Sequence, residues 1–167
     1  GGFVVAGFAE RTHEEDDNAL LMKVGPAGRV LWQVEFGDDR EDHATAVAQT
    51  ADGGYIVAGQ FGSNTDPDSD AFLVKTDSRG REVWRRLFDS GGHDTAVSVE
   101  QTPDGGYLVG LQLDLLGEAR ATMAKTAPDG STLWQVDAGV ATHPVRAFAT
   151  ADGGYVLAWW EIDFFPA

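Results

Sequence analysis

The chain has 167 residues, of which 43% are apolar, and its 27 acidic against 12 basic side chains give a net charge of −15. An acidic surface repels phosphate backbones, which argues against nucleic acid as a partner. The absence of cysteine excludes disulfides and thiolate metal sites, and no apolar run approaches the ~20 residues of a membrane helix. The acidity suits a high-salt habitat, so a halophilic source is one expectation and an ordinary secreted protein is the other.

A short sequence motif built on a Gly-Gly pair recurs along the chain. Gly-Gly pairs begin at positions 1, 53, 105 and 153, and the last three follow Asp and precede Tyr. Aligning 1–52 with 53–104 needs no gap and gives 19 identities. We therefore expect repeats over 1–52, 53–104 and 105–152 and a partial repeat over 153–167, in a stacked or radial architecture. Because the chain starts inside a repeat, we expect it to be a fragment of a longer protein.

The second repeat predicts four short strands, at 54–60, 71–76, 82–88 and 95–101, separated by Gly, Pro, Asp and Ser turns. No segment shows a sustained helical period, so no helix is expected. Applied to the whole chain, the pattern predicts three strands in 3–36, four-stranded groups in 44–88 and 96–137, and two strands in 145–160. Four antiparallel strands per repeat of this length are typical of a propeller blade, so the fold class is all-β, an arc of about three blades.

These residues also resemble a known family. The motif Asp52-Gly53-Gly54-Tyr55 is followed by Lys75-Thr76-Asp77 and then by Gly80 and Trp84. Together these residues resemble the blades of the quinoprotein-like (PQQ-like) β-propeller superfamily. They are most similar to the DGGY-type repeats of archaeal and bacterial secreted or surface proteins. The resemblance implies that strand 95–101 is innermost and that the Trp-bearing strand is outermost. It implies that Trp32, Trp84 and Trp134 pack between blades as structural residues. It carries no cofactor residues over, because the vicinal cysteines common in the quinone-dependent enzymes are absent.

The glycine pairs serve turns in this interpretation. Asp52, Asp104 and Asp152 are expected to accept backbone N–H groups, while at least one glycine of each following pair takes a positive φ. The same conformation is expected at Gly28, Gly80 and Gly130. The structural glycines of the paired turns are Gly53, Gly54, Gly105, Gly106, Gly153 and Gly154.

Two loops carry alternating oxygen donors that resemble the start of a calcium loop. The first holds Glu14, Asp16 and Asn18, and the second holds Asp66, Asp68 and Asp70. Neither loop has the glycine or the closing glutamate of such a site. Solvated acidic loops are therefore the alternative to calcium, and no other cofactor is expected.

The four histidines lie at 13, 43, 93 and 143. His43 and His143 are each nine residues before the Asp of a DGGY turn, and Asp42 and Asp94 share the preceding column. A His and an Asp at the mouth of a channel suit metal binding or acid–base chemistry. Loop histidines bonded to the backbone are the alternative.

The sequence contains no nucleophile elbow, phosphate loop or metalloprotease helix. We therefore expect a non-catalytic propeller module of an extracellular or cell-surface protein, acting as a scaffold or binding a protein or a glycan. The alternative is part of a propeller enzyme, quinone-linked or glycan-active, whose active residues lie in further blades.

Overall fold

The computed structural model describes residues 1–10, 17–37, 40–62, 68–141 and 145–159, and within them the chain is entirely β-structure. The described residues form thirteen strands in four antiparallel sheets, in each of which consecutive strands are neighbours. The described residues contain no helix long and apolar enough to cross a membrane. The all-β class and the absence of helix in the described part agree with the sequence prediction.

The first sheet has three strands, β1 (Phe3–Ala9), β2 (Asn18–Val24) and β3 (Val30–Phe36). The second and third sheets have four strands each. These are β4 (Asp42–Gln49), β5 (Tyr55–Phe61), β6 (Asp70–Thr76) and β7 (Glu82–Phe88), then β8 (Thr95–Gln101), β9 (Tyr107–Leu115), β10 (Glu118–Thr126) and β11 (Thr132–Val140). The last sheet pairs β12 (Arg146–Ala149) with β13 (Tyr155–Ala158). The predicted grouping of strands as three, four, four and two is therefore confirmed.

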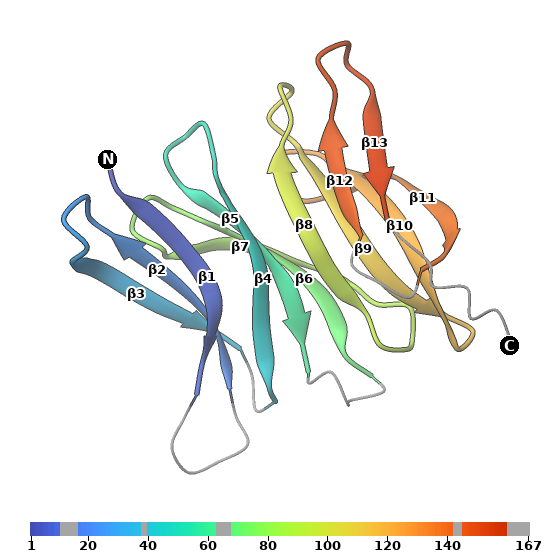
Figure 1. Ribbon diagram of the computed structural model, residues 1–167, viewed down its shortest axis with the longest axis horizontal. Coiled ribbons are helices and arrows are strands. Elements are labelled where there is room, and N and C mark those ends of the chain that lie inside the picture. Colours follow the sequence, from blue (N-terminus) through green and yellow to red (C-terminus); the bar gives the residue numbers. More distant parts are fainter. Residues whose placement is uncertain (11–16, 38–39, 63–67, 142–144, 160–167) are drawn as a thin grey trace, which may run out of the picture.

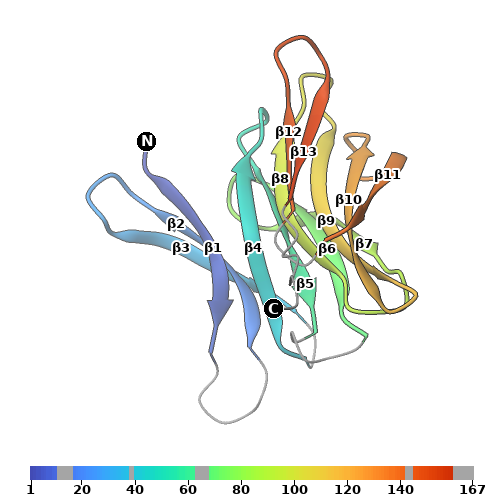
Figure 2. The same ribbon diagram turned by 45° about the vertical axis from the view of Figure 1, so that its right-hand side comes forward.

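The sheets follow one another in chain order, with their first strands side by side (Figure 1). β4 lies between β1 and β8, and β8 lies next to β12. The strands that end the first three sheets, β3, β7 and β11, lie on the side away from this row, as Figure 2 also shows. The N-terminal and C-terminal sheets are consequently at opposite ends of the row.

Side chains from facing sheets form the cores, and strand alternation decides which core each residue joins. Along β5, Tyr55, Val57 and Phe61 pack toward the first sheet, while Ile56 and Ala58 pack toward the third. Because both faces of β5 are covered, all seven of its residues are buried. This double cover explains why β5 is apolar apart from Gln60 and lacks the polar alternation of a half-exposed strand.

Hydrogen bonds between the first strands of neighbouring sheets add to this packing. The Thr45 hydroxyl on β4 donates to the Ala96 carbonyl on β8 at 2.5 Å, and the Ala147 N–H on β12 donates to Ser98 Oγ on β8 at 3.0 Å. Thr45 lies at an irregularity in the β4–β5 register, where two residues of β4 oppose one of β5. The bulge directs this hydroxyl across to the neighbouring sheet.

An aromatic pair joins each sheet to the next. The ring centroids of Trp32 and Tyr55 are 5.7 Å apart, as are those of Trp84 and Tyr107, and both pairs lie edge to face. The ring centroids of Trp134 and Tyr155 are 5.4 Å apart. Each of the three tryptophans is half-buried. They belong to the outer strands β3, β7 and β11, so one edge of each indole remains at the rim of the joint.

The indoles also occupy space left by turn glycines of the next sheet. A Cβ at Gly80 would lie 2.9 Å from Trp32 Cζ3, and a Cβ at Gly130 would lie 2.8 Å from Trp84 Cζ3. Both glycines have positive φ, +81° and +83°, as expected. Glycine at these turns therefore satisfies the backbone geometry and the fit of the neighbouring Trp at once.

We expect Trp84→Ala to lower the free energy of unfolding of the chain by roughly 3 kcal/mol, because the half-buried indole fills the joint between two sheets. The control is Val83→Ala, on the opposite face of the same strand and 62% exposed, which should cost less than about 0.5 kcal/mol. Urea unfolding followed by circular dichroism measures both. Equal effects of the two substitutions would contradict this role for Trp84.

Candidate functional site

The predicted calcium loops lie partly outside the described residues, since Glu14, Asp16 and Asp66 fall there. Asn18 is buried, and its amide donates to Glu35 Oε2 at 3.4 Å. In the second loop, Arg40 Nη1 donates to the Asp68 carbonyl at 3.1 Å, and Arg40 Nη2 lies 3.9 Å from Asp70 Oδ2. A guanidinium therefore already supplies positive charge to this loop, and within the described residues no three His, Asp or Glu side chains gather as a metal site.

The described histidines are separated and each has a local partner. His43 packs against Phe8 with ring centroids 4.7 Å apart, and its Nε2 lies 4.0 Å from Asp17 Oδ2. His93 Nδ1 is hydrogen-bonded to Ser69 Oγ. Ser69 is fully buried, so this Ser–His pair cannot present a nucleophile to a substrate. His13 and His143 lie outside the described residues.

Asp42 and Asp94, which share a column in the sequence, are fully buried, and each accepts a backbone N–H near the end of the following strand, β5 or β9. Asp42 Oδ1 accepts the Gly62 N–H at 3.1 Å, and Asp94 Oδ1 accepts the equivalent N–H of Asp114 at 2.9 Å. Ser90 bonds Asp94 through both its N–H and its hydroxyl. Burial raises the pKa of Asp94, which these hydrogen bonds partly offset. These two carboxyl groups therefore fasten loops to sheets.

The paired-glycine turns are built around a buried lysine. Lys75 Nζ donates to Asp52 Oδ2 and to the Thr76 carbonyl, each at 2.8 Å, while Asp52 Oδ1 accepts from the Thr50 hydroxyl and from the Gly54 N–H. Lys75 is only 5% exposed. Its ammonium is thus neutralised by one carboxylate at the surface end of its buried stem.

The two glycines of each pair have different tasks. Gly53, Gly105 and Gly153 have φ of +82°, +83° and +86°, which confirms the expected left-handed residue in each turn. The second glycine provides space instead. A Cβ at Gly54 would lie 2.1 Å from the Thr76 carbonyl oxygen and 2.7 Å from Lys75 Nζ. A side chain at this second position would displace the lysine from its acceptors.

The equivalent turn in the third sheet repeats the arrangement. Lys125 is 2% exposed, and its Nζ lies 2.9 Å from Asp104 Oδ2 and donates to the Thr126 carbonyl at 2.9 Å. The Thr102 hydroxyl, the Lys125 ammonium and the Gly106 N–H lower the pKa of Asp104 to about 2. The same three kinds of donor, led by Lys75, lower the pKa of Asp52. The recurring Asp, Gly and Lys are thus accounted for by the turn.

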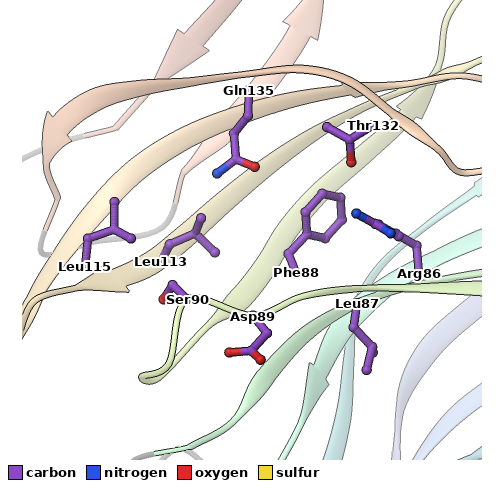
Figure 3. A pocket seen from close by; sticks show the side chains of 9 residues that line it. All are labelled: Arg86, Leu87, Phe88, Asp89, Ser90, Leu113, Leu115, Thr132 and Gln135. Atoms are coloured by element: carbon purple, nitrogen blue, oxygen red, sulfur yellow. The ribbon is translucent and has the colours of Figure 1, made fainter.

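Another candidate is a groove between the outer parts of the second and third sheets, with a volume of about 420 Å³. Its side chains come from three strands and the loop after β7 (Figure 3). They are Arg86, Leu87, Phe88, Asp89, Ser90, Leu113, Leu115, Thr132 and Gln135. This volume lies in the range of small-molecule sites in proteins. We call it the β7–β11 groove.

The floor of the β7–β11 groove is apolar and its rim is polar. Phe88 and Leu113, exposed by 6% and 3%, belong to the core between the two sheets, and Leu115 packs on that core. In Figure 3, Gln135 and Thr132 project from β11 on one side, and Leu87 points away. The side chains of Arg86, Thr132 and Gln135 have no hydrogen-bond or ion-pair partner in the part of the chain that the structure describes. They are therefore available to a ligand.

The corresponding position between the first and second sheets is occupied. There the Arg85 guanidinium lies 5.2 Å from the centre of the Phe61 ring and bonds Glu82 through two nitrogens, at 3.0 and 2.7 Å. In sequence alignment, Arg85 corresponds to Gln135 and Phe61 to Leu113. The shorter side chains at the second joint leave open the space that a stacked Arg fills at the first.

The β7–β11 groove was missed by the sequence prediction. Aligning the copies would have shown the replacement of Arg85 by Gln135 and of Phe61 by Leu113, but not that both positions face one joint.

No protein-family model and no curated protein matches the chain.

We expect the unfolding midpoint in urea to fall as the pH drops from about 4 to about 2. Asp104 has an ordinary pKa of 3.8 and a folded-state pKa of about 2. Its ionised carboxylate therefore contributes fully to the free energy of unfolding above pH 3.8, and this contribution is lost as the pH falls toward 2. Asp104→Asn should flatten this part of the pH profile, while the exposed control Glu10→Gln should leave it unchanged. An unaltered profile for Asp104→Asn would contradict the role of the ion pair.

Proposed function

We propose that the sheets are consecutive blades of a β-propeller and that the chain is a non-catalytic binding or scaffold module of an extracellular or cell-surface protein. The observation that carries the proposal is the joint between sheets, in which a Trp of one sheet packs on a Tyr of the next. The pairs Trp32–Tyr55, Trp84–Tyr107 and Trp134–Tyr155 repeat it. A joint repeated head to tail rotates each unit by a similar amount, which favours a closed ring.

The exposure of the end sheets supports the ring. β5 is completely buried because sheets cover both of its faces, whereas the corresponding strand β1 has no buried residue and β13 is largely exposed. Phe3 on β1 is 66% exposed and Val156 on β13 is 47% exposed. Apolar surface of this kind is typically covered, and further blades would cover both ends.

The polar residues support a non-catalytic role. Among the described residues, the recurring carboxylates at 42, 52, 94 and 104 bind backbone groups, hydroxyls or a buried lysine. The β7–β11 groove is suited to binding, because Arg86, Thr132 and Gln135 at its rim have no partner among the described residues. The net charge of −15 and the absence of cysteine suit a secreted domain that relies on packing, in a halophilic or an ordinary setting.

Negative-stain electron microscopy of the intact protein tests the architecture. We expect ring-shaped particles with a central channel, because each blade would turn by a similar angle relative to the last. Particles shaped as an open row of sheets, without a channel, would contradict the propeller.

Protease treatment of intact cells tests the location. With an antibody against this segment, we expect the signal to disappear on treatment of whole cells, while a cytoplasmic control protein survives. Survival of the segment until the cells are lysed would contradict an extracellular or surface location.

A further inference from the structure

We propose that the β7–β11 groove binds a neutral sugar unit of a glycan. This inference rests on the proposed binding function and specifies its ligand. It is carried by the composition of the groove, by three rim side chains that have no partner among the described residues, and by the contrast with the filled position at the preceding joint.

The rim offers donors and acceptors together. Arg86 supplies only donors, Gln135 and Thr132 supply both kinds, and Asp89 supplies acceptors. One Asp89 oxygen accepts the Gly91 N–H at 2.8 Å, which leaves the other oxygen for a ligand. A hydroxyl group both donates and accepts, so a ring bearing several hydroxyls can satisfy all four side chains.

The floor suits the other face of such a ring. The surface formed by Phe88, Leu113 and Leu115 is apolar, and pyranose rings carry C–H groups that pack on surfaces of this kind. A purely apolar ligand would strip water from Arg86 and Asp89 without replacing their hydrogen bonds. The combination of an apolar floor and a mixed polar rim therefore favours a polyhydroxylated ligand.

Charge argues for a neutral ligand. An anion would gain from Arg86 but would meet Asp89 at the same rim and the field of a chain with a net charge of −15. A cation would be repelled by the Arg86 guanidinium. An extended peptide is less suited, because the groups available here are side chains and not a row of free backbone N–H and C=O groups.

The preceding joint provides the matched substitutions. Gln135→Arg copies Arg85, which stacks on Phe61 at the first joint, so the added guanidinium should lie over Leu113 and fill the groove. Arg86→Val copies Val34, the corresponding residue of β3, and removes the charged donor. Arg85→Gln changes the first joint alone and serves as the control.

The experiment is a titration of the ¹⁵N-labelled chain with maltose, cellobiose and mannobiose, followed by NMR. We expect at least one of these sugars to shift the Gln135 side-chain amide together with the backbone signals of Ser90, Leu115 and Thr132. Gln135→Arg and Arg86→Val should each raise the Kd about tenfold or more, as expected for loss of a hydrogen bond involving a charged group or of the space itself. Arg85→Gln should leave the Kd unchanged, and circular dichroism should confirm that each variant is folded.

Several outcomes would overturn the proposal. These are no shift with any of the three sugars, shifts at residues outside the groove, or stronger binding of glucuronate or of an unstructured peptide than of the neutral sugars. If Gln135→Arg does not fold, Arg86→Val decides the matter alone. A groove that binds no sugar, in a protein that forms rings at the cell surface, would refute this inference and leave the proposed function standing.

Discussion

The structure depends on covering both faces of its inner sheets. A sheet with two apolar faces is insoluble unless a neighbour packs on each side, and the fully buried β5 shows the result of such packing. The cores on its two sides belong to different sheet pairs, so its alternate residues serve different neighbours. The stability of one sheet is consequently linked to that of the next, as in other arrays of stacked units.

The turns connect the packed strands, and their positions accept fewer residue types than the positions in the cores do. Gly53 is required for its backbone conformation and Gly54 for the absence of a side chain, because the Lys75 ammonium occupies the adjacent space. The buried lysine in turn requires Asp52, whose carboxylate is held by several donors. The Asp, the two glycines and the lysine therefore depend on one another for their contacts, which explains why they recur together along the chain.

The sequence predicted the strands well because their boundaries are marked by turn residues with defined backbone needs. The predicted segment 82–88 coincides with β7, and 95–101 coincides with β8. The sequence indicated the packing role of the tryptophans but not their degree of exposure, because a sequence does not show how far an outer strand extends past the core. The β7–β11 groove escaped prediction for a related reason, since it arises where Gln135 and Leu113, distant in sequence, are smaller than their counterparts.

The buried lysines also determine the chemistry of the surface. The chain contains only three lysines, Lys23, Lys75 and Lys125, all in the same column of the aligned copies. Lys75 and Lys125 are enclosed, and Lys23 is half-buried with its Nζ 5.5 Å from the centre of the Tyr55 ring. The side-chain cations that project into solvent are therefore guanidinium groups, which are more weakly hydrated than ammonium groups. Reagents that acylate primary amines should find few side-chain targets on this surface, and its positive charge should persist even in strongly alkaline brine.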